Sequence, residues 1–427
     1  MSKIVLAYSG GLDTSVLLKK LVLEGNDVIA MTADLGESDA STALETGSAS
    51  GDPAGELERV RAKAIALGAS DAVVIDARER FVQDYAYRAL RANAMYEGVY
   101  PLSAALSRPL IGALLVETAH ASGADTVAHG CTGKGNDQVR IELAVRALDS
   151  QVKVRAPLRE RPLSRPGAMA FAAEHGIPLK HTAAQPYSID ANLWGRSIEA
   201  GILEDPWNAP PEDAYAWTAS PQVRPSAPDE IILHFEEGIP WIGSFDYAQD
   251  DKSGPAMIAA LNVLAGRHGV GRIDVVEDRV IGMKSREVYE APAATTLIAA
   301  HQALERLVLT RDELRFKAGC DQKYAELTYD GLWMSPLRIA FDAFNATSAY
   351  RISGEVRVRL HQGCATIAGV RSPFALYDET LATYGQGDAF DHHAADGFIR
   401  LHGLPLDLVA RTGKRSLDFD PSGLRSG

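Results

Sequence analysis

The feature that most constrains this chain is a short polar stretch near its N-terminus. It reads Ala7-Tyr8-Ser9-Gly10-Gly11-Leu12-Asp13-Thr14-Ser15. An apolar run at residues 4–8 leads into it, and apolar residues at helical spacing follow it until Gly25. This order predicts a strand, a tight turn and the N-terminus of a helix. Such a turn offers free backbone N–H groups and the positive end of a helix dipole, which suit a phosphate chain.

Two readings of this stretch compete. The first is purely structural: an ordinary strand–helix turn in which a serine or aspartate caps the helix. The two glycines allow a ligand to approach the backbone closely, and Ser9, Thr14 and Ser15 add hydroxyl donors. The loop contains no lysine, so it is not the GxxxxGK[ST] loop of phosphoryl transfer. The surrounding polar residues favour phosphate binding.

Strand and helix patterns alternate through the first 175 residues or so. Further strands are predicted at residues 28–32, 72–75, 126–128 and 152–156, and helices at 56–67 and 81–96. Another helix is predicted to carry Pro109 in its first turn and to end at Gly123. Alternation of this kind predicts an α/β fold with a doubly wound parallel sheet, whose ligands bind at the C-terminal ends of the strands.

The rest of the chain is predicted to be organised differently. Residues 37–55 have no apolar periodicity, and we expect a mobile surface loop or a lid there. Residues 176–371 are proline-punctuated and predict a second, α+β domain. Its strands are expected at 231–235 and 272–276, its helices at 257–264, 295–307, 312–317 and around Tyr324, and a β-hairpin about Gln362-Gly363. Residues 372–427 are expected to hold a short helix and a polar tail from 411 to 427.

Composition narrows the partners and the compartment. The chain has 427 residues, a formal charge of −13 and three cysteines far apart, Cys131, Cys320 and Cys364. An acidic chain is a poor partner for nucleic acid, which binds clustered lysine and arginine. The cysteines form neither a disulfide framework nor a CxxC metal spacing, which favours a reducing cytoplasm. No apolar run is long enough to span a bilayer, so we expect no membrane partner.

A second polar cluster follows the predicted strand at 126–128. It reads His129-Gly130-Cys131-Thr132-Gly133-Lys134-Gly135-Asn136-Asp137-Gln138-Val139-Arg140. Asn136 and Arg140 are four residues apart, so they share one helix face. A plain strand–helix loop capped by Asn136 or Asp137 is the alternative. Six polar residues at the edge where a nucleotide should lie favour a binding site instead.

At this point the chain resembles a known family. The first loop resembles the pyrophosphate loop of the ATP pyrophosphatase (PP-loop) superfamily, and the whole chain resembles argininosuccinate synthases. Besides the two polar clusters, the motifs that carry the resemblance lie at residues 94–98, 186–190, 192–197, 201–206, 269–274 and 282–286. Several motifs in order over two domains are more specific than any one of them.

The resemblance implies a carbon–nitrogen ligase of arginine biosynthesis. The family joins citrulline and aspartate with ATP, through a citrullyl-AMP intermediate, and releases AMP and pyrophosphate. AMP makes the citrulline ureido oxygen a leaving group, and the aspartate amine then attacks the carbon. The resemblance further implies Mg²⁺ bound to the ATP, no tightly bound protein metal, an adenine nucleotide α-hydrolase-like N-terminal domain, and a homotetramer whose C-terminal segment contacts other subunits.

The resemblance also assigns site residues, which single positions would not reveal. The ATP-binding residues are Ala7, Tyr8, Ser9, Gly10, Gly11, Leu12, Asp13, Thr14, Ser15, Ala33 and Gly130. The aspartate-binding residues are Thr132, Asn136 and Asp137. The citrulline-binding residues are Tyr100, Asn136, Arg140, Ser188, Ser197, Glu277 and Tyr289. Asp13, Asp137 and Arg140 are the expected catalytic residues. His129 is expected to be a buried histidine bonded to the backbone.

Five residues at four sites depart from the family pattern. Ala104 stands where a citrulline-binding threonine is usual, and the adjacent Ser103 could replace it. Glu287 stands where glycine is usual, Ala293-Ala294 replaces a glycine pair, and Glu37 replaces a glutamine. These departures bear on citrulline binding and on the segment around Tyr289, and leave both phosphate-facing clusters intact.

Two other functions stay open on the sequence. The nearer is a different PP-loop enzyme that thiolates tRNA or amidates a substrate. The acidic charge counts against the first, and the lack of an N-terminal cysteine nucleophile or a glutaminase domain counts against the second. The more distant is a non-catalytic nucleotide-binding protein, which would leave the second polar cluster and the second domain without a purpose.

Overall fold

The computed structural model describes residues 2–36, 53–178, 187–242 and 254–412. The chain forms two compact units, residues 1–374 and 375–427. The predicted loop at 37–55 lies outside the described residues except for its last three, which begin a helix. The predicted polar tail lies outside them from residue 413 onward. A domain boundary near residue 175 stays a prediction.

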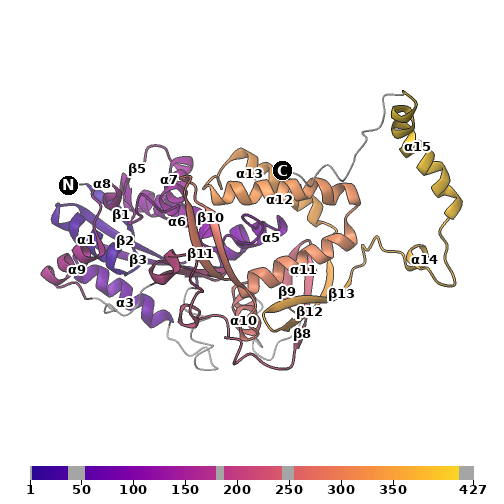
Figure 1. Ribbon diagram of the computed structural model, residues 1–427. Coiled ribbons are helices and arrows are strands. Elements are labelled where there is room, and N and C mark those ends of the chain that lie inside the picture. The colour runs from indigo at the N-terminus through magenta and orange to yellow at the C-terminus, as the bar shows by residue number, and fades with distance from the viewer. Residues whose placement is uncertain (1, 37–52, 179–186, 243–253, 413–427) are drawn as a thin grey trace, which may run out of the picture. The chain divides into compact units, whose positions relative to one another are not determined.

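A five-stranded parallel sheet forms the N-terminal part of the larger unit (Figure 1). Its strands are β1 (Lys3–Ala7), β2 (Asp27–Asp34), β3 (Asp71–Asp76), β4 (Thr126–Ala128) and β5 (Lys153–Arg155). Their order is β3-β2-β1-β4-β5, and every neighbouring pair is parallel. The predicted α/β class with a doubly wound parallel sheet is therefore confirmed. The sheet order reverses direction at β1, so the two loops that follow β1 and β4 leave the sheet side by side.

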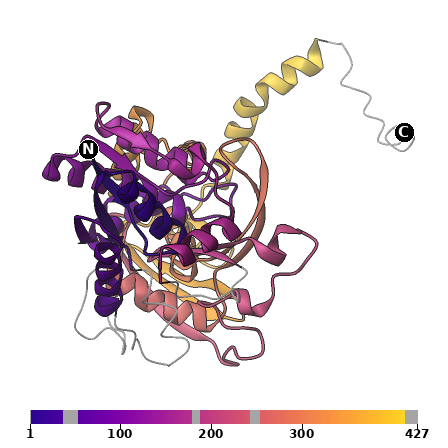
Figure 2. The ribbon, with the colours of Figure 1, turned by 90° about the vertical axis from the view of Figure 1, so that its left-hand side faces the viewer.

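Helices cover both faces of this sheet (Figures 1 and 2). Ile4 and Leu6 of β1 pack with α1 (Leu12–Leu23), α3 (Pro53–Ala66) and α9 (Arg165–Glu174), in one apolar cluster. Val5 points to the opposite face and belongs to the cluster that includes α6 (Ser103–Ser122). Alternate residues of a strand point to opposite faces, so a strand buried on both sides is apolar throughout.

Two helix predictions were wrong in detail. Pro109 lies inside α6, not in its first turn, because the helix begins at Ser103. The apolar residues of α6 are buried along most of its length, which offsets the lost backbone hydrogen bond at the proline. The helix predicted at 81–96 is instead α4 (Arg78–Phe81), a π-helical turn η1 (Val82–Ala86) and α5 (Tyr87–Arg91). It ends early because Asn93 takes a left-handed conformation, with φ of 41°.

The rest of the larger unit contains two antiparallel sheets. The first has the order β10-β11-β7-β6, and the second β13-β12-β8-β9. The strands are β6 (Ser188–Asn192), β7 (Gly195–Glu199), β8 (Asp229–Glu236), β9 (Ile239–Ile242), β10 (Arg272–Asp278), β11 (Lys284–Glu290), β12 (Gly354–His361) and β13 (Cys364–Arg371). The hairpin predicted about Gln362-Gly363 joins β12 to β13, and both residues have positive φ, as a tight hairpin requires.

The helices of this region are longer than predicted. They are α10 (Gly254–Arg267), α11 (Pro292–Val308), α12 (Arg311–Tyr329) and α13 (Pro336–Ala349). The two helices predicted at 312–317 and around Tyr324 are one helix, α12. A capping box at Thr310 and Glu313 starts it. The unit also contains α7 (Asp137–Leu148) and three short helical segments, α8 (Pro157–Glu160), η2 (Gly201–Glu204) and η3 (Glu212–Ala214).

The β6–β7 hairpin fixes the first antiparallel sheet onto the part that contains the parallel sheet. The backbone N–H of Leu193 donates to the carbonyl of Leu35 at 3.0 Å. The indole Nε1 of Trp194 donates to the carbonyl of Pro101 at 2.9 Å, and Asn192 Nδ2 to that of Ser103 at 2.9 Å. Gly36 has a φ of 79°, and a Cβ there would lie 2.6 Å from the side chain of Leu193, so this position suits glycine on two grounds. These hydrogen bonds therefore attach the β6–β7 hairpin to the segments beside the parallel sheet.

The smaller unit contains α14 (Glu379–Ala382) and α15 (His392–Arg411). The short helix predicted here is 20 residues long in α15, and it continues through Pro405. Leu401, Leu406 and Val409 are among its exposed apolar residues. Among the described helices, none is both long and apolar enough to cross a membrane.

A buried ion pair secures the sheet that contains β11. Glu290 is fully buried, and Arg196 on β7 donates to it at 2.6 Å. The backbone N–H groups of Ala216, Trp217 and Thr218 also donate to this carboxylate, at 2.9 to 3.0 Å. One side chain thus ties two strands to the irregular segment that covers them.

We expect Glu290→Ala to lower the free energy of unfolding by about 3–5 kcal/mol, because Arg196 and three backbone donors would lose their acceptor inside the protein. Urea unfolding followed by circular dichroism measures the change. The control is Glu355→Ala, whose partner Arg371 has a side chain 78% exposed. That change should cost less than about 1 kcal/mol. Equal losses in the two variants would contradict the role given to Glu290.

Candidate active site

The first polar loop joins β1 to α1. Gly10 has a φ of 75°, and a Cβ there would lie 3.0 Å from Val60 of α3, so this position suits glycine on two grounds. Gly11 is the N-cap residue of α1 and has no side chain to cap the helix, while its own N–H donates to Ser9 Oγ at 3.4 Å. Ser9, Gly11 and Asp13 are exposed. The helix start therefore presents backbone donors outward, as an anion site requires.

Hydroxyl groups and one lysine fix the shape of this loop. The hydroxyls of Ser9 and Thr14 lie 3.1 Å apart, and those of Tyr8 and Ser15 lie 3.2 Å apart. Lys63 of α3 donates to the carbonyl of Gly10 at 2.8 Å. The positive charge that the loop sequence lacks is thus supplied by a helix more than fifty residues further along the chain.

The second polar loop lies directly beside the first. It follows β4, which pairs with β1 so that Leu6 lies opposite Ala128. A Cβ on Gly130 would lie 3.4 Å from the methyl group of Thr14. The two predicted phosphate-facing clusters therefore meet at one edge of the sheet. Ala33 lies near the end of the neighbouring strand β2, opposite Ile75 of β3.

His129 is a structural residue of this loop. It is 1% exposed, its Nδ1 accepts a hydrogen bond from the backbone N–H of Cys131 at 3.2 Å, and its Nε2 lies 3.1 Å from Glu142. The hydrogen bond with His129 lowers the pKa of Glu142, and Arg159 lowers it further. This arrangement agrees with the expected buried, backbone-bonded histidine.

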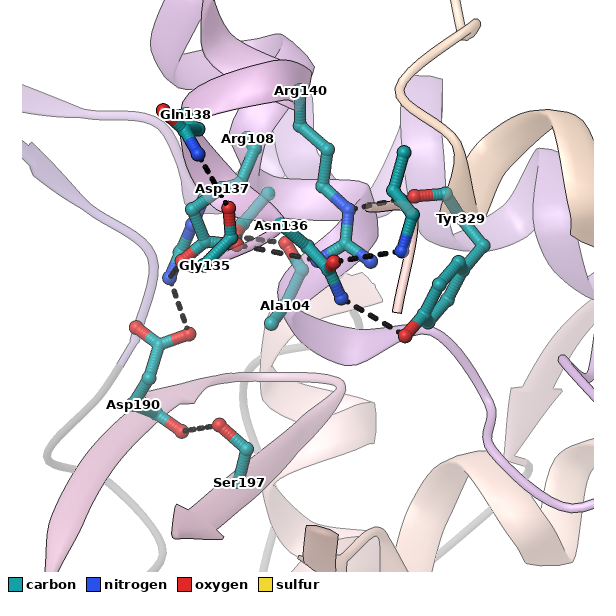
Figure 3. Close-up of polar contacts among 12 residues, drawn as sticks. Ala104, Arg108, Gly135, Asn136, Asp137, Gln138, Arg140, Asp190, Ser197 and Tyr329 are labelled. Carbon is teal, nitrogen blue, oxygen red and sulfur yellow. Dashed lines mark hydrogen bonds and ion pairs between the residues drawn. The ribbon is translucent and has the colours of Figure 1, made fainter. Parts of the chain in front are cut away.

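One guanidinium group joins the second loop to the antiparallel sheet (Figure 3). Arg108 of α6 donates through Nη2 to Asp137 at 2.7 Å and to Asp190 of β6 at 2.7 Å. Its side chain is only 12% exposed. Asp137 also accepts from Arg140 at 3.2 Å, so two cations face it. Asp190 shares Arg108 with Asp137.

The two carboxylates differ in their pKa. Burial would raise the pKa of Asp137, but the charges and hydrogen bonds of Arg108 and Arg140 outweigh burial and lower it. Burial raises the pKa of Asp190, and Arg108 compensates only in part. Asp137 therefore stays charged and suits a substrate ammonium group.

Arg140 is buried and held in place (Figure 3). Its Nε donates to the carbonyl of Tyr329 at 2.8 Å, and its guanidinium lies 4.6 Å from the centre of the Tyr329 ring. Its Nη2 is buried and has no hydrogen-bond partner among the described residues. A buried donor without an acceptor is costly, so this nitrogen is a candidate contact for a substrate carboxylate.

Glu277 lies at the centre of a polar network. It is 2% exposed, Tyr289 donates to one of its oxygens at 2.8 Å, and Tyr329 donates to the other. Asn136 donates to the Tyr329 hydroxyl at 2.9 Å. Burial raises the pKa of Glu277, and the two tyrosine hydroxyls lower it in part. Tyr100 stacks on Tyr289 with ring centres 3.9 Å apart.

The remaining predicted citrulline residues share one sheet face with these. Register places Ser197 of β7 opposite both Tyr289 of β11 and Asp190 of β6. Ser188 is two residues before Asp190, and Glu277 is four residues after Ile273, the partner of Tyr289. Side chains two or four apart on a strand point the same way. Ser188, Ser197, Glu277 and Tyr289 therefore lie on the face that carries Asp190.

Comparison with known proteins identifies the family. A profile of the argininosuccinate synthase N-terminal HUP domain matches residues 3–178, and a profile of the C-terminal domain of the same family matches residues 187–409. The argininosuccinate synthase of Gloeobacter violaceus is 51% identical over 416 residues, which cover 96% of this chain and 99% of that relative. The argininosuccinate synthase of Geobacillus kaustophilus is 50% identical and covers 99% of both chains.

The chain belongs to the argininosuccinate synthase family. It is accordingly a carbon–nitrogen ligase that joins citrulline and aspartate with ATP, through citrullyl-AMP, in arginine biosynthesis. Neither a different PP-loop activity nor a non-catalytic role is supported. Among solved structures, a 4-thiouridine synthetase bound to RNA and ATP aligns with 41% of each chain at 15% identity. Its TM-score of 0.28 is too low to bear on fold or function.

The structure shows the surroundings of most residues that depart from the argininosuccinate synthase pattern. The backbone N–H of Ala104 donates to the Tyr100 hydroxyl at 2.9 Å. Glu287 is 7% exposed and accepts from Arg279 at 2.7 Å. Ala293 and Ala294 are fully buried in α11. Glu37 lies outside the described residues.

Sequence reasoning missed three residues of this argininosuccinate synthase site: Arg108, Asp190 and Tyr329. A clue to Arg108 was available, because it is a lone cation among the apolar residues of α6, and buried charges in such positions need partners. Asp190 lies in the family motif at residues 186–190, but the resemblance did not assign it to a binding site. Tyr329 carried no local signal, since its contacts come from residues far away in the chain.

We expect Cys131, which lies between Gly130 and Thr132, to resist alkylation. Burial raises the pKa of its thiol to about 12, with a further contribution from the charge of Asp137. Three pKa units mean roughly a thousandfold less thiolate than an ordinary thiol has. Iodoacetamide at pH 8, followed by peptide mass spectrometry, should label the exposed Cys364 first. Unfolded protein, in which the cysteines should react alike, is the control. Labelling of native Cys131 as fast as Cys364 would contradict the raised pKa of its thiol.

Proposed function

We propose a division of this site into one nucleotide subsite and two amino-acid subsites. The nucleotide subsite holds ATP, with Mg²⁺ as part of that substrate. It consists of Ala7, Tyr8, Ser9, Gly10, Gly11, Leu12, Asp13, Thr14, Ser15, Ala33 and Gly130. This assignment is supported by the start of α1, whose N-cap is a glycine, and by the position of Gly130, where an added Cβ would touch Thr14. Among the described residues there is no cluster of three or more metal-ligating side chains.

The citrulline subsite lies where Arg140, Glu277 and the stacked tyrosines meet. Arg140 binds the citrulline carboxylate through its Nη2, and Glu277 binds the citrulline ammonium. Tyr100 and Tyr289 shape the wall, and Ser188 and Ser197 complete the subsite from the same sheet face. The unpartnered Nη2 of Arg140 is the observation that carries this assignment.

The aspartate subsite lies in the second polar loop. Asp137 binds the aspartate ammonium, and Thr132 and Asn136 bind its carboxylates. Asn136 already bonds to Tyr329 and to the backbone N–H of Val280, at 2.9 and 3.0 Å. Its amide keeps a second N–H and further lone pairs for the substrate. Asn136 thus belongs to both amino-acid subsites.

Catalysis follows from placement of charge. The two loops hold the nucleotide so that the citrulline ureido oxygen attacks the α-phosphorus and pyrophosphate leaves. Arg140 orients citrulline, and Asp137 orients the aspartate amine toward the ureido carbon, from which AMP departs. Asp13 lies exposed in the first turn of α1, beside the proposed phosphate subsite, as the third catalytic residue.

The assembly and the division into domains are also proposals. We propose that residues 1–175 bind the nucleotide and that residues 176–371 supply the second sheet face. Residues 372–427 would contact other subunits of a homotetramer. The exposed apolar residues of α15 support this role. We further propose that the enzyme works in the cytoplasm, where free cysteines such as Cys364 persist.

Pyrophosphate release tests the proposed subsites as a whole. With ATP and Mg²⁺, release should require citrulline, and argininosuccinate should form only when aspartate is added. A coupled pyrophosphate assay and chromatography of the products measure the two steps. Pyrophosphate release without citrulline, or with tRNA in its place, would contradict the proposal.

We expect Asp137→Ala to weaken the use of aspartate while citrulline-dependent adenylation is largely kept. Loss of a charged hydrogen bond to the ammonium should raise the aspartate KM by about 10- to 100-fold. Asp137→Asn, which preserves the shape of the side chain, separates this effect from a shift of Arg140. Asp149→Asn, beyond the other end of α7, is the control. Equal loss of adenylation and ligation would show that Asp137 has a different role.

A further inference from the structure

Glu287 is a buried carboxylate on the face that carries the proposed site. It lies on β11 between Ser285 and Tyr289, and it is 7% exposed. Arg279 donates to it at 2.7 Å and the hydroxyl of Ser285 at 2.8 Å. Burial raises the pKa of Glu287, and the hydrogen bond from Arg279 opposes this effect. A carboxylate in this position therefore depends on its arginine.

Arg279 belongs to the connection between β10 and β11 and has three partners. Its Nη2 donates to Glu287 and, at 2.7 Å, to Glu199 of β7. Its Nη1 donates to the backbone carbonyl of Lys134, at 3.3 Å. The next residue, Val280, donates its backbone N–H to Asn136 at 3.0 Å. The strand connection therefore contacts the second polar loop at two successive points.

The second polar loop is only weakly fixed by hydrogen bonds between its own residues. Thr132, Gly133 and Lys134 are exposed. Its internal contacts include the bond from the Gly135 N–H to the carbonyl of Thr132, at 3.3 Å, and the bond from the Cys131 N–H to His129, at 3.2 Å. The Gln138 side chain also donates to two loop carbonyls. Glycines leave such a loop many backbone conformations. Arg108 holds the end of the loop at Asp137, and Tyr329 contacts Asn136. The exposed part before Asn136 is contacted by Arg279 at Lys134, next to the bond from Val280 to Asn136.

We propose that Glu287 is a positioning residue for the aspartate subsite: by fixing Arg279, it holds the loop that carries Thr132, Asn136 and Asp137. This inference rests on the proposed assignment of those three residues to aspartate. Glu287 acts through Arg279 and needs no contact with the substrate.

Glu287 is the more effective of the two carboxylates that hold Arg279. The side chain of Glu199 is 43% exposed, whereas that of Glu287 is 9% exposed. Solvent screens an exposed ion pair, and a buried one retains its strength and direction. Without Glu287, the guanidinium would keep only the exposed partner, and the bond to Lys134 would lose its fixed donor.

Kinetics with each substrate in turn test this role. Glu287→Ala should raise the aspartate KM by about tenfold, since aspartate must then order the loop on binding. Glu287→Gln, which keeps an acceptor but loses the charge, should show a smaller rise. The KM for ATP and kcat should change by less than about twofold. The KM for citrulline should rise less than that for aspartate, because Asn136 stays bonded to Tyr329 and citrulline also binds Arg140 and Glu277. A similar rise in all three KM values would indicate a general structural role and overturn the inference.

A double variant tests whether Glu287 acts through Arg279. The aspartate KM of Arg279→Ala should rise at least as far as that of Glu287→Ala. The double variant should match Arg279→Ala, because the second change removes nothing further. Multiplied effects in the double variant would overturn the inference. The control is Asp274→Asn, which removes the partner of Arg286 from the opposite face of the same sheet and should leave the aspartate KM unchanged.

Hydrogen exchange of the free enzyme gives a readout that does not depend on aspartate. Glu287→Ala should speed exchange at residues 132–138 and leave residues 9–15 unchanged. Unchanged exchange at 132–138 would overturn the anchoring of the loop. Faster exchange with an unchanged aspartate KM would overturn the positioning role. In that case, Asp137→Ala in the otherwise native enzyme decides where the error lies: an unchanged aspartate KM there also refutes the proposed subsite, and a raised one refutes only the role of Glu287.

Discussion

The site depends on a single buried cation that two separate parts of the fold must both neutralise. Arg108 projects from α6, a helix whose buried residues are mainly apolar and which covers the parallel sheet. A guanidinium there is tolerated only with carboxylates at hydrogen-bonding distance, and removal of one partner from such a pair costs about 3–5 kcal/mol. Asp137 comes from the loop after β4, and Asp190 from the antiparallel sheet. Burial of Arg108 thus requires these two elements to meet.

A similar arrangement recurs at two other places in this antiparallel sheet. Glu290 binds Arg196 and three backbone donors, and Glu277 binds two tyrosine hydroxyls. Each carboxylate is buried, and each is satisfied by elements distant in sequence. Apolar packing brings the layers together without fixing their register, whereas directional bonds to buried charges do fix it. These hydrogen bonds therefore fix the positions of the side chains that we propose contact the substrates.

Local and long-range features differ in how far the sequence predicts them. The strand, glycine turn and helix around residues 4–25 were predictable, because each depends on neighbours in the chain. The parallel sheet followed from the alternation of elements. The start of α6 was not predictable, because Pro109 signals a helix start and only burial overrides it. Arg108 and Asp190 are 82 positions apart, so no spacing rule could pair them. The subsite residues themselves rested on family resemblance.

The polar groups of the site are held before any substrate arrives. Both ends of the Asn136 amide are bonded, both oxygens of Glu277 accept tyrosine hydroxyls, and Arg140 is fixed by a backbone carbonyl and by Asp137. Groups held in this way lose little further freedom on binding and need little reorganisation during reaction. The ligation has no evident need of a covalent nucleophile, so its acceleration must come from such placement. The loop that carries Thr132 is the exception, since its glycines leave it the least constrained part of the site, and its anchor through Arg279 therefore matters most for aspartate.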